Sequence, residues 1–265
     1  MSSHIRFYST LTRKVEDFTP ITGGVVQIYA CGVTTYDNAH IGHARQAIFF
    51  DIVRRYFVFQ GFKVNYVRNY TDIDDKIIDR AHLLDRDPLE LSDYYVNETA
   101  ADFASLKIAK ATHEPKVTDH IKDIISLIED LIKINVAYVA EGDVLFDVTT
   151  FPTYGKLSGL NQNELINSDK STYKKHPQDF VLWKRAKTNE PSWPSRWGNG
   201  RPGWHIECSA LAKKYLGDHI DIHGGGIDLI FPHHENEIAQ TESLTHGIFA
   251  SYWLHNGLVM VDGKK

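Results

Sequence analysis

The sequence has few cysteines, no long apolar run and no excess of positive charge. Only Cys31 and Cys208 are cysteines among 265 residues, so a disulfide framework is excluded and two buried thiols or shared metal ligation remain. No apolar run approaches the roughly 18 residues that span a bilayer, and the first residues lack the apolar core of a secretory signal. We therefore expect a cytoplasmic protein without a membrane segment. The net charge of −5 argues against general binding of nucleic acid through overall positive charge.

A short apolar, β-branched run comes before a turn that contains two histidines. Residues 25–30 predict a buried strand, and residues 46–61 carry apolar side chains at helical spacing. In an open α/β sheet, ligands bind at such carboxyl-end turns, and the amino end of the following helix attracts anions. Taken singly, His40 and His43 would most often be ordinary loop residues. Together, with Gly42 between them, they favour donation to a phosphate.

The following residues predict a parallel sheet with an insertion. Residues 62–67 alternate as a second strand, so strand, helix and strand form a right-handed βαβ unit. Thr71 lies in the next carboxyl-end turn and should face His40. Helices are expected at about 74–84, 88–106, 117–135 and 210–216, a hairpin at 138–148 and a short strand at 220–222. We predict an α/β fold: a Rossmann-type parallel sheet (1–115 and 201–265) with an inserted connective α+β module (116–200).

Four side chains that are distant in sequence form a candidate metal-binding set. Pro232 suits the first turn of a helix, on which His233 and Glu237 share one face. A pair at this spacing is more often only a surface pair. With the thiols of Cys31 and Cys208, however, it completes the mixed sulfur, nitrogen and oxygen set that a tetrahedral zinc ion accepts.

Five motifs resemble those of the cysteinyl-tRNA synthetase family of class I aminoacyl-tRNA synthetases. They are Cys-Gly-Val-Thr-Thr-Tyr-Asp with His-Ile-Gly-His, Asn-Tyr-Thr-Asp-Ile-Asp-Asp-Lys, Gly-Trp-His-Ile-Glu-Cys-Ser-Ala, Asp-Ile-His-Gly-Gly-Gly, and Phe-Pro-His-His-Glu-Asn-Glu-Ile-Ala-Gln. They occur in the family's order, so the resemblance covers nearly the whole chain.

The resemblance implies a role for individual residues. His40 and His43 would be the catalytic residues that bind ATP phosphates. Substrate-binding residues would be Thr71, Trp204 and Asp228. The ATP site would comprise Thr34, His40, His43, Gly224, Gly225, Gly226 and Lys265, the glycines letting the adenosine lie against backbone. The metal ligands would be Cys31, Cys208, His233 and Glu237.

The implied activity is ATP-dependent activation of L-cysteine and its transfer to tRNA(Cys). Zinc would select the substrate thiol, and Mg²⁺ would accompany ATP. We expect a monomer. The chain ends at Lys265, the first residue of the family's Lys-Met-Ser-Lys-Ser loop, so we expect impaired activity, and tRNA contacts mainly in a missing C-terminal region. The alternatives are a cysteine:amino-sugar ligase of thiol biosynthesis on the same scaffold, and a non-catalytic, zinc-stabilised binding module.

Overall fold

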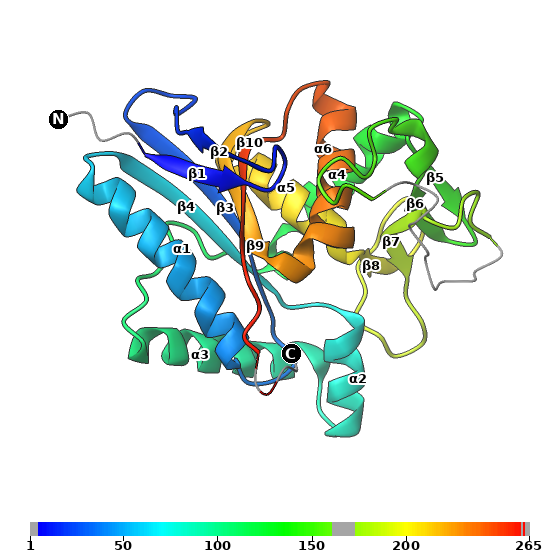
Figure 1. Cartoon of the computed structure of the whole chain (residues 1–265). Coiled ribbons are helices and arrows are strands. Elements are labelled where there is room, and N and C mark those ends of the chain that lie inside the picture. Colours follow the sequence, from blue (N-terminus) through cyan, green and yellow to red (C-terminus); the bar gives the residue numbers. More distant parts are fainter. Residues whose placement is uncertain (1–4, 161–172, 261, 263–265) are drawn as a thin grey trace.

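A four-stranded parallel sheet forms the centre of the structure (Figure 1). The computed structural model describes residues 5–160, 173–260 and 262. Its central strands, in spatial order, are β10 (Ala250–Asn256), β9 (Ile220–Gly226), β3 (Val25–Thr34) and β4 (Lys63–Thr71). The neighbours β3 and β9 come from opposite ends of the chain, and their pairing aligns Ile28 with Ile222. The two halves of the sequence therefore meet in the middle of this sheet, as predicted for a parallel sheet with an insertion.

Helices cover both faces of the central sheet. Helix α1 (Ile41–Phe59) connects β3 to its parallel neighbour β4 and packs Phe50, Val53 and Phe57 against the face that carries Val26 and Ile28. The opposite face carries Tyr29 and Cys31 and is covered by α5 (Trp204–Leu216) and α6 (Glu235–Thr245). Because side chains alternate along a strand, Cys31 points away from α1 and toward these two helices.

Other segments of the chain protect both edges of the central sheet. The hairpin β1 (Arg6–Ser9) and β2 (Lys14–Asp17) lies along β10, where the Thr10 amide donates to the carbonyl of Trp253 at 2.9 Å. At the other edge, residues 113–116 run beside β4, and the Tyr70 amide donates to the carbonyl of Pro115 at 2.8 Å. These contacts satisfy backbone groups that an open edge would leave unpaired.

A second, antiparallel sheet lies between the two halves of the central sheet in sequence. It is preceded by a 3₁₀ turn (Val117–His120) and α4 (Ile121–Lys133), and its strand order is β5 (Ala137–Ala140), β6 (Asp143–Phe146), β7 (Phe180–Arg185) and β8 (Gly200–Pro202). The hairpin predicted at residues 138–148 is confirmed. The core is continuous, because Ile124 of α4 and Leu182 of β7 belong to the same buried cluster as Leu211 of α5.

An ionic contact joins this second sheet to the helix that follows β4. Helices α2 (Asp75–Leu83) and α3 (Pro88–Ser105) follow β4. The carboxylate of Asp75, the first residue of α2, accepts hydrogen bonds from Lys184 at 2.8 Å and from the buried guanidinium of Arg201. Short 3₁₀ turns at Val148–Thr150 and Ile227–Leu229 and a π-type turn at Ile230–His234 complete the elements. Among the described residues, no helix combines the length and apolar character needed to cross a bilayer.

Several predicted boundaries were wrong near the site. Strand β3 continues to Thr34 through a register shift between Ala30 and Val33, so Cys31 lies in a bulged strand rather than in the turn. Helix α1 begins at Ile41 instead of residue 46. Strand β9 extends past residue 222 to Gly226, because its glycines allow close pairing with β10. Helix α6 begins at Glu235, after a break at Phe231, and Pro232 therefore precedes it.

Candidate active site and metal cluster

Two thiols, an imidazole and a carboxylate converge at the carboxyl end of the central sheet. Cys31 comes from the bulge of β3, Cys208 from the second turn of α5, His233 from the turn before α6, and Glu237 from the first turn of α6. One ligand atom of each lies within 4.8 Å of the others, and all four residues are buried. The structure therefore brings together the four residues that the sequence predicted as metal ligands.

The distances within this cluster suit ligands that share one centre. The two sulfur atoms lie 3.5 Å apart, and Cys31 Sγ lies 3.4 Å from Glu237 Oε1. Nε2 of His233 lies 3.5 Å from Cys208 Sγ and 3.1 Å from Glu237 Oε1. None of the four residues is more than 3% exposed. The donor atoms thus form a compact, dry group that can hold a metal ion.

Electrostatics disfavour this cluster in its fully deprotonated, metal-free form. Burial, followed by the hydrogen bond to Cys208, raises the pKa of Cys31 well above its ordinary value, and burial also raises the pKa of Cys208. Burial lowers the pKa of His233 well below its ordinary value. Two thiolates beside a carboxylate require a positive partner in a medium of low dielectric constant. A divalent cation supplies that charge and binds the deprotonated thiols and the neutral imidazole that coordination needs.

A layer of further histidines surrounds the cluster, which we did not predict from the sequence. His223 Nε2 lies 2.7 Å from Glu237 Oε2, and His234 Nε2 lies 3.3 Å from Cys31 Sγ. His234 Nδ1 in turn contacts His255 Nε2 at 2.7 Å. Such contacts orient the ligands of metal sites. The available signal was the position of His234 in the same motif as His233 and Glu237, and that of His223 in the neighbouring Asp-Ile-His-Gly-Gly-Gly motif.

His40 and His43 form a stacked pair at the start of α1. Their ring centroids lie 3.8 Å apart with planes 14° from parallel. The Gly42 amide donates to His40 Nδ1 at 3.1 Å, and the His40 amide donates to His43 Nδ1 at 3.3 Å. Each neutral ring must then carry its proton on Nε2. Burial and the neighbouring His40 lower the pKa of His43 to about 4, so it is neutral at pH 7. The pair can present two N–H donors beside a helix amino terminus.

The predicted substrate residues lie around the two groups just described. Thr71 ends β4 and is buried, and its hydroxyl donates to Glu207 Oε2 at 3.0 Å. Trp204 begins α5, stacks on His233 with centroids 4.2 Å apart, and remains 36% exposed. Asp228 is exposed, and its charge is close enough to His43 to oppose the lowering of that residue's pKa.

The predicted ATP-binding residues other than the two histidines lie in different parts of the structure. Thr34 ends β3, directly opposite Thr71. Gly224 to Gly226 are buried in β9, and a Cβ atom on Gly224 would lie 2.0 Å from the Leu254 carbonyl oxygen, so this glycine is needed for close packing between strands. Lys265 lies outside the described residues. The roles that we predict for these individual residues remain predictions.

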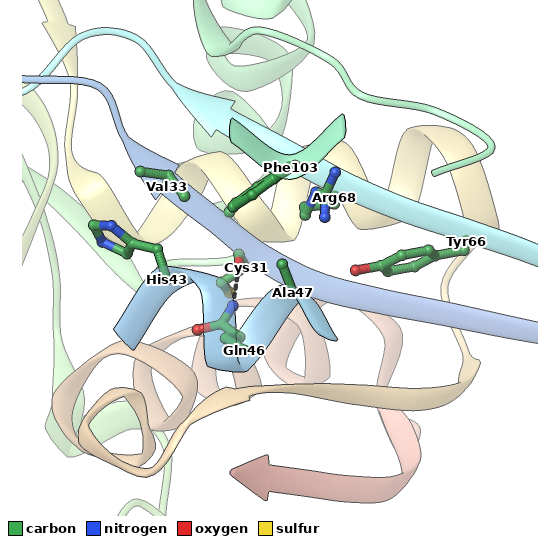
Figure 2. A pocket seen from close by; sticks show the side chains of 9 residues that line it. Cys31, Val33, His43, Gln46, Ala47, Tyr66, Arg68 and Phe103 are labelled. Carbon is green, nitrogen blue, oxygen red and sulfur yellow. Dashed lines mark hydrogen bonds between the residues drawn. The ribbon is translucent and has the colours of Figure 1, made fainter. Parts of the chain in front are cut away.

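A small pocket borders both Cys31 and His43. Figure 2 shows the residues that line it, which come from β3, α1, β4 and α3. The Gln46 side chain of α1 donates to the Cys31 carbonyl at 2.5 Å and so ties the histidine-bearing helix to the bulge. Arg68 forms part of the pocket wall, pairs with Glu114 at 2.5 Å and lies over the ring of Phe103.

Comparison with known proteins identifies the family. Residues 17–265 match the family described as tRNA synthetases class I (C) catalytic domain. The chain belongs to this cysteine–tRNA ligase family. It is 52% identical over 264 residues to cysteine–tRNA ligase of Desulforamulus reducens and 51% identical to that of Aquifex aeolicus, with 98% of this chain covered in each case. The Methanococcus maripaludis cysteine–tRNA ligase is 52% identical over 264 residues.

The family's catalytic region makes up only part of these relatives. The chain spans 54% of the Desulforamulus protein, 53% of the Aquifex protein and 56% of the Methanococcus protein. Among solved structures, methionyl-tRNA synthetase of Mycobacterium tuberculosis in complex with methionyl-adenylate aligns with a TM-score of 0.68 at 12% identity, covering 88% of this chain and 57% of that one. A structure described as a putative arginyl-tRNA synthetase of Campylobacter jejuni aligns at 0.57 and 14% identity, covering 90% and 56%. These structures confirm the class I synthetase fold.

Proposed function

We propose that the cysteine–tRNA ligase family site of this chain activates L-cysteine with ATP and uses zinc to select the substrate thiol. The observation that carries the proposal is the convergence of Cys31, Cys208, His233 and Glu237 in one buried group beside the His40–His43 pair. The donor set of two sulfurs, one nitrogen and one oxygen fits zinc better than magnesium or calcium, which prefer oxygen ligands.

The activation step needs mainly positioning and stabilisation of phosphate charge. The cysteine carboxylate attacks the α-phosphate of ATP, giving cysteinyl-adenylate and pyrophosphate. The Nε2–H groups of His40 and His43 are proposed to donate to phosphate oxygens as negative charge develops on them. Because the pKa of His43 is near 4, this residue contributes hydrogen bonds rather than a full positive charge. Mg²⁺ would accompany the ATP phosphates.

Discrimination against serine requires more than the size of a pocket. Cysteine and serine differ by one atom, and pockets that exploit size alone discriminate by about 10- to 200-fold. Zinc held by the four residues would prefer a thiolate over an alcohol. Thr71, Trp204 and Asp228 are proposed to contact the remainder of the amino acid, since they surround the cluster and the histidine pair.

Transfer to tRNA is proposed for a longer protein that contains this region. The relatives are nearly twice as long as the matched segment, which leaves room for additional tRNA-binding domains. We propose tRNA(Cys) as the acceptor and the cytoplasm as the compartment, in line with the family's role in protein synthesis.

The test combines metal analysis with ligand binding. The purified chain should contain one zinc ion, and calorimetry should show cysteine binding at least about 1,000-fold tighter than serine, beyond what size alone gives. After removal of zinc with a chelator, this preference should fall to the size-limited range. A metal-free protein that still rejects serine to the original extent would rule out zinc as the selecting element. An assay with tRNA and amino-sugar acceptors then separates the two cysteine ligase reactions.

A further inference from the structure

A single buried amide connects the metal cluster to the proposed amino-acid pocket. Asn69 lies on β4, two residues before Thr71, and is only 1% exposed. Its Oδ1 accepts hydrogen bonds from the Gly32 amide at 3.0 Å and from the Tyr29 hydroxyl at 3.2 Å. Because the Gly32 amide can only donate, the oxygen must face β3. The Nδ2 group must then face Thr71, and it donates to Thr71 Oγ1 at 3.3 Å.

The same network reaches both cysteines of the cluster. Gly32 directly follows Cys31 in the bulge of β3, and Cys208 Sγ lies 3.8 Å from Asn69 Oδ1. The hydrogen-bond network continues from Thr71 to helix α5, because the Thr71 hydroxyl donates to Glu207, the residue before Cys208. These contacts therefore link β3, β4 and α5 to one another around Asn69.

Part of this arrangement is explained by backbone packing alone. A Cβ atom on Gly32 would lie 1.4 Å from the backbone oxygen of Asn69, so the bulge rests directly on β4. A bulge removes an amide from the strand ladder, and an unsatisfied buried amide costs about 1–3 kcal/mol. An acceptor at position 69 is enough to meet this need. The Nδ2 donor is not required for it, and an aspartate would supply the acceptor without the donor.

The extra donor fixes the orientation of Thr71. Its hydroxyl oxygen accepts from Asn69 while its proton goes to Glu207, a carboxylate that is fully buried. With both contacts in place, the side chain has one favourable χ1 rotamer. We propose that Asn69 is a positioning residue that fixes the orientation of the Thr71 side chain relative to Cys208, so that cysteine affinity depends on the Nδ2 group of Asn69. This inference rests on the proposed function and deepens it.

The test is a double-mutant cycle on cysteine affinity. We expect Asn69→Asp to weaken cysteine binding about tenfold, the equivalent of one hydrogen bond, in a zinc-loaded chain of otherwise native sequence. In a Thr71→Val background, which lacks the hydroxyl, the same change should weaken binding about tenfold less than it does with Thr71. The added negative charge near Cys208 is present in both backgrounds and cancels in the cycle. Asn65→Asp, on the same strand but away from the cluster, is the matched control and should bind cysteine like the native chain.

The possible results distinguish the positioning role of Asn69 from the proposed function. If Asn69→Asp weakens binding equally with Thr71 and with valine, or not at all, the positioning role is wrong although the proposed function stands. If the native chain binds neither zinc nor cysteine, the proposed function itself fails. Should Asn69→Asp not fold, hydrogen exchange of the Asn69 side-chain amide by NMR decides. Protection should be strong in the native chain and lost in Thr71→Val, and equal protection in both would overturn the inference.

Discussion

Substitution of Gly224 by alanine separates a packing role from a ligand-binding role for the glycines of β9. A Cβ atom on Gly224 would lie 2.0 Å from the Leu254 carbonyl oxygen and 2.8 Å from Phe50 Cζ. Ordinary contacts are 3.4 Å or longer, so the backbone of β10 would have to retreat by more than an ångström. Overpacking of this kind costs about 1–3 kcal/mol, and we expect the upper end because the contact is with backbone.

Two other glycines, Gly225 of β9 and Gly23 before β3, provide controls. On Gly225 the nearest contact is the flexible end of Leu229 at 2.7 Å, so alanine there should cost about 1 kcal/mol. Gly23 has open space around the added atom, and its substitution should change stability by less than about 1 kcal/mol. Urea unfolding of the three variants at equal metal content measures this order. If Gly224→Ala is as stable as the native chain but loses ATP affinity, the packing argument is refuted and the glycine serves the nucleotide.

Three further predictions concern the metal, the pH dependence and the ionic contact. Chelation should lower the melting temperature of the native chain, because free zinc at about 100 times its Kd stabilises the fold by roughly 2.7 kcal/mol. The same treatment should hardly change the melting temperature of Glu237→Gln, and melting curves with and without chelator measure both. Burial lowers the pKa of His255 to about 3, so the metal-free fold should lose stability as the pH falls below 6.5. Between about pH 6 and 5, His255→Asn should reduce the slope of unfolding free energy against pH by up to about 1.4 kcal/mol per pH unit. An unchanged slope would contradict this prediction. Asp75→Asn should lower the free energy of unfolding in urea by about 2 kcal/mol, because it leaves the buried Arg201 without its charged partner. Lys184→Ala, at a more exposed site, should lower it by less than about 1 kcal/mol. Equal losses would show that the pair with Arg201 is no stronger than the pair with Lys184.

The sequence was most informative where spacing and chemistry coincide. The four candidate ligands were identified because the only two cysteines lie in family-like motifs and, with His233 and Glu237 of a third motif, complete a mixed donor set for zinc. The parallel pairing of β3 with β4 followed from a short strand, a helix and a second strand. The strand pattern is local, whereas the ligand set came from motifs that lie far apart in the chain and was recognised through their chemistry.

What remained hidden depends on contacts between distant segments. The β3 bulge arises because Gly32 rests on β4, which no local pattern reveals. His255 belongs to β10, a strand that we did not predict from the sequence, and it reaches the cluster only through His234. The network of Asn69 was missed for the same reason, since its partners come from two other elements.

The spacing of the proposed metal ligands along the chain has a consequence for biosynthesis. Cys31 and Glu237 are 206 residues apart, and the whole antiparallel sheet is synthesised between them. A ribosome must therefore synthesise most of the domain before the last proposed ligand emerges. An ion bound by Cys31 and Glu237 would close a long loop of chain, and the entropy cost of closing a loop grows only slowly with its length. Zinc capture at the proposed site would then be a late event that requires β3 and α5 to be already packed together, so a nascent chain halted before α6 should be unable to retain zinc.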